Sequence, residues 1–210
     1  FSASFSEGVY QESRVGPTLV YNTVDRPDRP RRGMRLTAKA DVAVPVLGGT
    51  VQYVRPEAEA VLFVPHTRRT AIGARGGVGW LFSRAGTDSL PYYRRYFLGG
   101  DNDVRGVDFR TVGPFDDQGR AVGGTRYVLF NVEYYVDIGP VRALAFHDAG
   151  QAFDEGEPVN LRLLRTSSGV EARFNMPMLN VPVRIIYAWN IYRDSFQKPH
   201  TLKFGVGTTF

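Results

Sequence analysis

Apolar and polar residues alternate along the last ten positions of the chain, which read TLKFGVGTTF. Side chains two apart point the same way in a strand, so an apolar face is expected from Leu202, Phe204, Val206 and Phe210. The other face carries only Lys, Gly and Thr. A terminal strand leaves backbone groups unpaired along its edge, and a closed barrel removes that edge. The pattern therefore predicts a membrane β-barrel.

The same alternation recurs along the chain and predicts ten strands, most of them near the about 9 to 11 residues that a tilted membrane-spanning strand needs. The expected ranges are 1–10, 14–23, 33–44, 51–64, 70–82, 126–137, 141–153, 164–175, 182–192 and 201–210. Most connections are short, which favours antiparallel hairpins in sequence order. The expected fold class is all-β, an antiparallel meander that forms a transmembrane β-barrel.

The two faces are clearest in residues 33–44 and 126–137. In the second range, an outward, lipid-facing row is expected from Val128, Phe130, Val132, Tyr134 and Val136. The inward row holds Asn131, Glu133 and Asp137. Aromatic rings near strand ends are expected to form girdles at the membrane surfaces. These residues are Tyr92, Tyr93, Tyr96, Phe97, Tyr134, Tyr135, Tyr187, Trp189 and Tyr192.

Composition fits one domain of short strands: 210 residues, 43% of them hydrophobic, with 23 glycines. The mean hydropathy is slightly negative, as expected when every second residue faces a polar lumen. Without cysteine the chain has no disulfide or thiolate metal site, and its three His residues lie too far apart for a zinc motif. No nucleophile elbow or phosphate-binding glycine motif occurs. We therefore expect no enzyme activity, cofactor or metal. A water-soluble barrel or sandwich remains the alternative fold.

The net charge of +5 comes mostly from arginine. A basic chain raises the question of nucleic acid. Here the arginines are scattered through alternating segments rather than gathered in one stripe, apart from a turn at residues 26–35. This favours a hydrated, charge-lined lumen over a nucleic-acid surface.

One connection, at about residues 83–125, is far longer than the others and rich in Gly, Asp and Arg. Loops of that length inside a compact domain are usually functional or disordered. It contains the stretch YFLGGDNDVRGVDF at residues 96–109.

These residues resemble the C-terminal part of the barrel of the BamA family, the outer-membrane assembly and translocation superfamily. In that family a long loop folds into the lumen and carries a Val/Ile-Arg-Gly-aromatic motif. Here it reads Val104-Arg105-Gly106-Val107, with Phe109 expected to supply the missing ring. The family's inward Glu on the next strand is matched by Glu133. The Phe/Trp-x-Asp-x-Gly motif of the strand after it is matched by Phe146, Asp148 and Gly150.

The resemblance implies that Arg105 and Gly106 fix the loop to the wall through Glu133 and Asp148. An arginine can bind two carboxylates at once because its donors form a fixed fork. In a partly wet lumen such bonds are worth about 1 to 3 kcal/mol. The alternative is a solvated Arg105, with the carboxylates merely lining the wall.

The closing strand also resembles the family's C-terminal signal, through Leu202, Phe204, Val206, Gly207 and Phe210. In the family this strand pairs weakly with the first barrel strand and forms a seam that opens toward the membrane. Glycine permits a kink or an inward curl, and Gly205 and Gly207 fit that role.

The resemblance further implies that residues 1–210 are the C-terminal portion of a sixteen-stranded barrel in the bacterial outer membrane. Six strands, POTRA domains and a signal peptide are then expected before Phe1. A self-contained ten-stranded barrel is the alternative.

The implied function is assembly and insertion of β-barrel proteins into the outer membrane. Expected partners are membrane lipids and lipopolysaccharide, unfolded outer-membrane protein clients, and periplasmic or lipoprotein accessory subunits, with no nucleic acid. Two alternatives remain: a protein-translocating pore of the same superfamily, resembling TamA or the two-partner secretion transporters, and a passive porin.

Overall fold

The computed structural model describes residues 11–83, 90, 92–175, 181–193 and 198–210. Ten strands make up most of its regular structure. They are β1 (Arg14–Val15), β2 (Thr18–Asn22), β3 (Gly33–Ala43), β4 (Tyr53–Pro65), β5 (Thr70–Trp80), β6 (Arg126–Ile138), β7 (Val141–Phe153), β8 (Arg165–Asn175), β9 (Pro182–Tyr192) and β10 (His200–Val206). Three 3-10 helices lie in the connections: η1 (Pro45–Leu47), η3 (Tyr92–Arg94) and η4 (Leu161–Leu163). Within these ranges, the helices are too short to cross a membrane.

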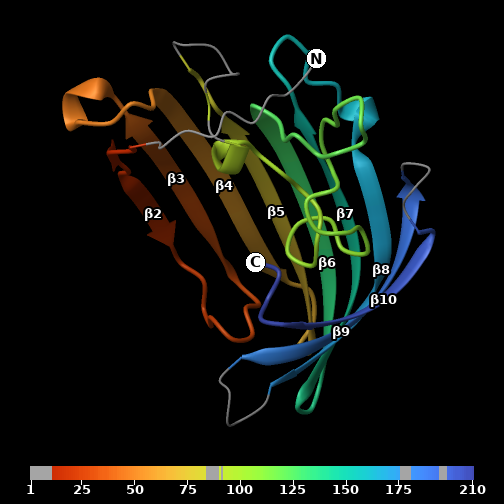
Figure 1. Cartoon of the computed structure of the whole chain (residues 1–210). Coiled ribbons are helices and arrows are strands. Elements are labelled where there is room, and N and C mark those ends of the chain that lie inside the picture. Colours follow the sequence, from red (N-terminus) through yellow and green to blue (C-terminus); the bar gives the residue numbers. More distant parts are fainter. Residues whose placement is uncertain (1–10, 84–89, 91, 176–180, 194–197) are drawn as a thin grey trace.

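The strands form one antiparallel sheet in which neighbours in sequence are also neighbours in space. Strands β3 to β10 pair in sequence order, and β1 and β2 both pair with the remaining side of β3. The sheet curls into a deep trough, and the long loop between β5 and β6 lies inside it (Figure 1). The predicted all-β antiparallel meander is confirmed.

Most predicted strand boundaries are accurate: β3 to β9 begin and end within two residues of the expected positions. The expected strand 14–23 is instead divided at Gly16 and Pro17. Pro17 has no N–H to donate, and a Cβ at position 16 would lie 2.6 Å from Asp41 Oδ1. The expected strand 1–10 lies outside the described residues.

The inner and outer faces alternate as the sequence predicts. On β6, Phe130 and Val132 point outward and are 44% and 48% exposed, whereas Asn131 and Glu133 point inward and are fully buried. Val128 of the expected lipid-facing row is only 6% exposed, although the alternation of β6 places it on the same face as Phe130. The sheet thus has an apolar outer surface and a polar inner one, as a membrane barrel requires.

Part of the expected aromatic girdle is wrong. Tyr134, Tyr187 and Trp189 are exposed on the outer face. Tyr96 and Tyr135 point inward and are buried. Tyr135 follows Tyr134 on β6, so the alternation of the strand places their rings on opposite faces. The other residues of the expected girdle are Tyr92, Tyr93 and Phe97, which lie in the β5–β6 loop, and Tyr192. The side chain of Tyr192 lies outside the described part of the structure.

The two ends of the sheet differ. At the lower end in Figure 1, β2 and β3 are joined by residues 23–32, β4 and β5 by residues 66–69, and β6 and β7 by residues 139–140. The two longest connections, the β5–β6 loop and the β7–β8 connection at residues 154–164, lie at the upper end. In outer-membrane barrels short turns face the periplasm and long loops face outward. We name the lower end the short-turn end.

The end of the chain departs from the expected strand 201–210. β10 stops at Val206, and Gly207 adopts a left-handed backbone with φ +105°. The chain then turns inward, so that Phe210 stacks on Phe63 of β4 with 6.0 Å between ring centroids. The expectation that Phe210 lies on the outer face is therefore wrong, because the ring is packed inside the trough. Leu202, Phe204 and Val206 stay outward and exposed.

Candidate functional site

Two carboxylates project from the inner face of the trough. Glu133 lies on β6 and Asp148 on β7, in a register that places Asn131 opposite Asp148 and Phe146 opposite Glu133. Both acidic residues are fully buried. A buried carboxylate is costly unless a cation or several donors face it. This part of the wall therefore requires a positively charged partner.

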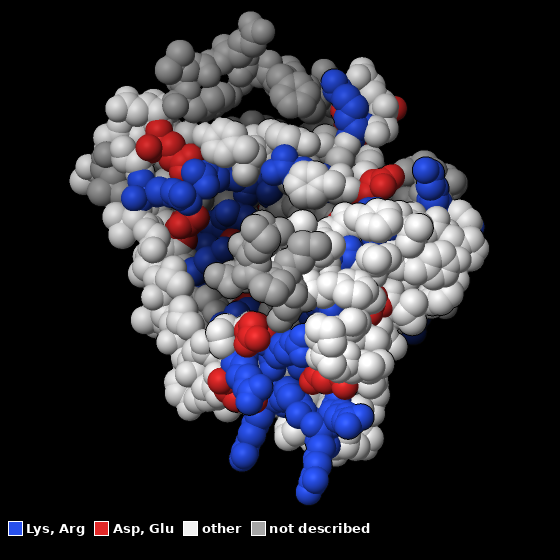
Figure 2. All heavy atoms as spheres, turned by 90° about the horizontal axis from the view of Figure 1, so that it is seen from below, with Lys and Arg blue, Asp and Glu red and all other residues white. Residues whose placement is uncertain are grey.

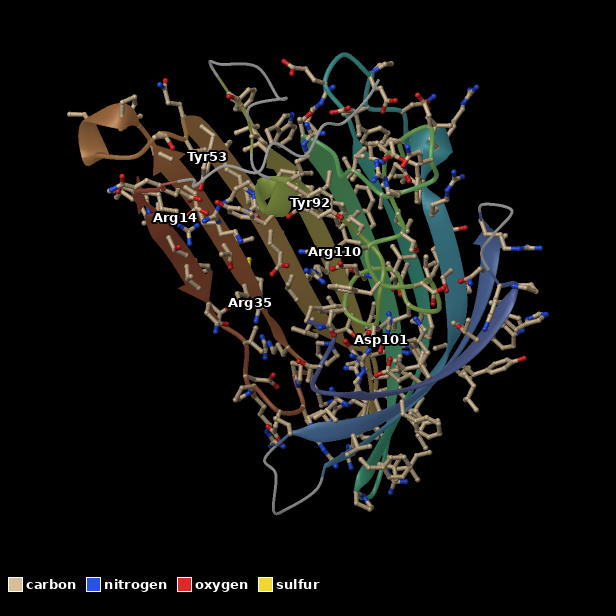
Figure 3. All side chains as sticks on the ribbon, viewed as in Figure 1. Arg14, Arg35, Tyr53, Tyr92, Asp101 and Arg110 are labelled. Atoms are coloured by element: carbon tan, nitrogen blue, oxygen red, sulfur yellow. The ribbon has the colours of Figure 1, made fainter. Side chains whose placement is uncertain are left out.

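The β5–β6 loop brings that partner into the trough. Its two arms are held together by isolated bridges between Tyr96 and Gly124 and between Leu98 and Val112. Figure 3 shows Asp101 and Arg110 of this loop within the concave face of the sheet. An apolar cluster packs the loop against β6, formed by Leu98, Val104, Val107, Val112 and Leu129. The loop is therefore a packed element of the interior.

Arg105 lies between the wall carboxylates. Its Nε and Nη2 donate to Asp148 Oδ2 and Oδ1, each over 2.7 Å. Its Nη1 donates to Glu133 Oε1 over 2.5 Å and to Glu171 Oε2 over 3.0 Å. The guanidinium carbon also lies 3.7 Å from the centre of the Phe146 ring. This arrangement uses both the fork and the flat face of arginine, which lysine lacks.

Gly106 allows the loop backbone to approach β9 and β10. Its φ is +82°, and a Cβ there would lie 2.4 Å from the Cβ of Ala188 on β9. The carbonyl of Gly106 accepts hydrogen bonds from Asn190 Nδ2 at 2.9 Å and from Thr201 Oγ1 at 3.2 Å. The loop tip is thus bonded to the last strand as well as to the wall.

Two more arginines share these carboxylates. Arg173 on β8 donates to Glu171 over 2.6 Å and to Glu133 over 2.8 Å. Arg184 on β9 donates to Glu171 over 2.7 Å. We define the lumen cluster as the six charged residues Arg105, Glu133, Asp148, Glu171, Arg173 and Arg184, each 5% exposed or less. Its three carboxylates and three guanidiniums balance in formal charge.

Neutral groups complete the cluster. Tyr135 donates its hydroxyl to Glu133 Oε2. Asn131 donates through Nδ2 to Asp148 Oδ1 over 2.8 Å and to the backbone oxygen of Asp103 over 2.7 Å. Their contacts satisfy lone pairs that the arginines leave, which lowers the cost of burying the charges.

Two loop groups have shifted pKa values. Burial lowers the pKa of Arg105, but Glu133 and Asp148 outweigh this effect and raise it above the ordinary value. Burial raises the pKa of Asp103 to about 6, opposed by Arg75 and reinforced by Asp148. Arg105 therefore stays charged, whereas Asp103 changes charge near pH 6. No group of three or more His, Cys, Asp or Glu in the described ranges is placed to hold a metal ion.

The expected residues come together in most cases. Arg105, Gly106, Glu133 and Asp148 form one contact set, and Phe146 lies beneath the guanidinium. A Cβ at Gly150 would lie 3.1 Å from Leu98 Cδ1 and 3.2 Å from Val104 Cγ2. Gly150 therefore leaves room for the loop.

Phe109 is the exception. It is 74% exposed, whereas Val107 is 2% exposed and packed in the apolar cluster. The loop reverses after Val107, where the N–H of Thr111 donates to the carbonyl of Asp108. The expectation that Phe109 replaces the family's aromatic residue is wrong, because Val107 itself fills the buried position.

Several residues of the site were not predicted to take part in it. Glu171 and Thr209 both bond to Arg105. Gly169 on β8 makes space for the Phe146 ring, since a Cβ there would lie 2.6 Å from Phe146 Cζ. The alternation of residues 164–175 is a signal that could have placed Glu171 inward, but nothing in the sequence placed Thr209 beside the loop.

Comparisons with known proteins show the family to which the chain belongs. Residues 4–210 match the model of the Omp85 superfamily domain. The chain belongs to the Omp85 superfamily. Omp85 proteins lie in the outer membrane, so this chain is a bacterial outer-membrane protein.

Two curated relatives of this Omp85 chain are named outer membrane protein assembly factor BamA. The one from Nitratidesulfovibrio vulgaris is 25% identical over 194 residues, covering 90% of this chain and 24% of the relative. The one from Neisseria meningitidis serogroup B is 25% identical over 223 residues, covering 90% and 28%. The chain thus spans about a quarter of the length of these relatives.

A solved structure shows the same fold. The crystal structure of BamA from Haemophilus ducreyi lacking POTRA domains 1–3 matches with a TM-score of 0.73 at 19% identity. The match covers 91% of this chain and 41% of that one. The Omp85 sheet described above is therefore similar in fold to the corresponding part of that barrel.

Proposed function

We propose that the protein to which this chain belongs assembles and inserts β-barrel proteins into the outer membrane. Residues 1–210 form the C-terminal portion of its barrel. The partners are unfolded outer-membrane proteins as clients, lipids and lipopolysaccharide around the barrel, and periplasmic or lipoprotein accessory subunits. No step requires a nucleotide, because client folding supplies the free energy.

The proposed site of client entry is the outer edge of β10. This strand has seven residues and pairs with β9 along one edge; within the described ranges, its other edge has no strand partner. A free edge offers backbone donors and acceptors to an extended client strand, as in other cases of strand addition. The exposed outward side chains of β10, which are Leu202, Phe204 and Val206, face the lipid that the client enters.

The observation that carries the proposal is the attachment of the loop tip to β10. Thr201 donates to the carbonyl of Gly106, and Lys203 Nζ donates to the carbonyl of Val107 over 2.8 Å. Arg105 anchors the same tip to β6 and β7. The loop therefore supports the edge strand from inside, and we propose that it holds this edge in position for a client.

The test replaces Arg105 in the full-length protein reconstituted in lipid vesicles, with an unfolded barrel protein as client. Arg105→Ala should lower the yield of protease-resistant, folded client several-fold. Arg105→Lys should restore little of the client yield, because a lysine ammonium cannot make the paired hydrogen bonds to Asp148 while also bonding Glu133. Undiminished insertion by Arg105→Ala would contradict the mechanism.

The matched control is Arg120→Ala. Arg120 lies in the same loop, and its side chain is 51% exposed and paired with Asp116 at 2.7 Å. Its side chain is exposed rather than buried in the lumen cluster, so client insertion should be unchanged. Both variants must show the folded barrel by heat-dependent gel mobility.

Single-channel conductance separates insertion from the two pore functions. A loop packed in the trough supports a mostly closed channel, whereas a secretion pore should conduct substantially when open. A passive porin predicts that Glu133→Gln alters ion selectivity without affecting assembly of other proteins. An insertase predicts that this variant lowers client assembly.

A further inference from the structure

Exposed arginines gather at the short-turn end of the sheet. Figure 2, which views the molecule from below, shows Lys and Arg side chains clustered there with few acidic ones between them. We define the basic rim as four exposed arginines from two turns: Arg26, Arg32, Arg68 and Arg69. Among the described residues, none of the four side chains has a hydrogen-bond or ion-pair partner.

Other arginines fasten these turns to one another. Arg31 donates to the backbone oxygens of Thr67 and Arg68, which ties the β2–β3 turn to the β4–β5 turn. Arg29 donates to the carbonyl of Gly139 over 2.9 Å, which adds the β6–β7 turn. These bonds hold the two halves of the basic rim together before any ligand arrives.

The nearby acids are already engaged. Asp25 accepts the backbone N–H groups of Arg31 and Arg32 at 3.0 and 3.3 Å. Asp137 pairs with Arg142 at 2.7 Å. Asp28 is the remaining acid in these turns. The rim therefore has a net positive charge, and its guanidiniums face water.

The outer surface next to the rim marks the edge of the apolar band. Val64 at the end of β4 and Ile72 near the start of β5 are 46% and 39% exposed. Beside them Tyr134 bonds through its hydroxyl to His66 Nδ1 over 2.9 Å. Tyrosine favours the headgroup level of a membrane. Arg68 and Arg69 come two and three residues after His66, in the same turn, which places them at the height of lipid phosphates.

We propose that the basic rim binds the phosphates of anionic phospholipid headgroups in the leaflet at the short-turn end. One guanidinium group can bind two phosphate oxygens at once. Several arginines held close together bind an anionic surface better than a single mobile arginine does. The shared height with the apolar band favours a lipid over an acidic protein segment. This inference does not depend on insertase activity.

The test uses the full-length protein reconstituted in vesicles of equal parts phosphatidylglycerol and phosphatidylcholine. After mild detergent extraction, the lipids retained by the protein are counted by mass spectrometry. The native protein should retain several-fold more phosphatidylglycerol than phosphatidylcholine, with the preference falling as salt is raised. Arg68→Gln/Arg69→Gln should lose most of that preference.

The matched control is Arg162→Gln/Arg193→Gln, which removes two exposed arginines at the opposite end of the sheet, one in η4 and one directly after β9. It should keep the native preference. Arg31→Gln keeps all four rim charges but removes the bonds between the β2–β3 and β4–β5 turns, and it should retain less phosphatidylglycerol than the native protein.

Equal retention by native protein and Arg68→Gln/Arg69→Gln would overturn the proposal. So would the absence of any preference in the native protein, an outcome that would point to an acidic protein segment instead. Heat-dependent gel mobility confirms that each variant is folded.

Discussion

Thr209 of the chain end and Arg105 of the loop belong to one hydrogen-bonded group, with 3.4 Å between Thr209 Oγ1 and Arg105 Nη1. The same oxygen accepts from Arg173 at 3.0 Å and from Arg184 at 2.9 Å. Loop and chain end are therefore held by the same arginines. A change at one should be detectable at the other.

Thr209→Val tests this coupling, because it removes the hydroxyl with little change in volume. Three buried arginines each lose an acceptor, at a cost of about 1 to 3 kcal/mol in total. The backbone N–H of Arg105, which donates to Asp148 Oδ2 over 3.0 Å, should exchange with deuterium several-fold faster. The neighbouring Thr208→Val serves as the control and should leave that exchange rate unchanged. Identical rates in both variants would show that the two ends are uncoupled.

Gly106→Ala should release the loop tip, because a methyl group would collide with Ala188 and the backbone is left-handed. Gly119→Ala is the matched control: its φ is +73° with nothing within 4 Å of the added Cβ. The control should cost only about 1 to 2 kcal/mol of local strain. Limited proteolysis of the loop would compare them, and equal cleavage of both variants would argue against the close fit at Gly106.

Loop docking should strengthen as the pH falls from 7 to 5. The pKa of Asp103 is raised by burial to about 6, so its charge is unfavourable in the docked loop. Because docking raises the pKa of Asp103, protonation of this carboxyl stabilises the docked loop. The stabilisation is complete below the ordinary pKa of an aspartate and is lost as the pH rises through about 6. The protection factor of the Arg105 amide, which is its exchange rate relative to an unstructured amide at the same pH, should rise accordingly in the native protein. Asp103→Asn should give a high protection factor at both pH values, and a pH response of the protection factor that survives this change would implicate another group.

Val107→Ser should destabilise the protein by about 1.5 to 3 kcal/mol, because a buried side chain is replaced by a polar one. Phe109→Ser should change the free energy of unfolding by less than about 0.5 kcal/mol, because its ring is exposed. Urea unfolding in lipid vesicles measures both. A larger loss for Phe109→Ser would mean that its ring is packed in the intact protein.

The sequence was sufficient for strands β3 to β9 and for the centre of the site. Period-two alternation identified the wall strands because one face is apolar and the other polar, and it placed Glu133 inward. The pairing of Arg105 with Glu133 and Asp148 came from the family resemblance, supported by the geometry of arginine.

Other features depend on contacts that no local pattern encodes. Alternation continues through Phe210, yet the left-handed backbone at Gly207 turns the chain inward toward Phe63. Val107 and Phe109 differ in burial because the loop reverses between them. The role of Thr209 depends on three arginines from separate elements, which only the folded chain brings together.

In the part of the chain that the structure describes, the side chains that accept hydrogen bonds from the Arg105 guanidinium all lie later in the sequence, at separations of 28, 43, 66 and 104 residues. Contacts at such distances form slowly, because a long segment must be closed before each is made. As the protein folds, the hydrogen bonds of Arg105 can therefore form only after the strands that follow it in sequence are in place. The interior reaches its complete set of bonds only when the final residues arrive, so a chain shortened by two residues would fold its sheet yet leave its loop less firmly held.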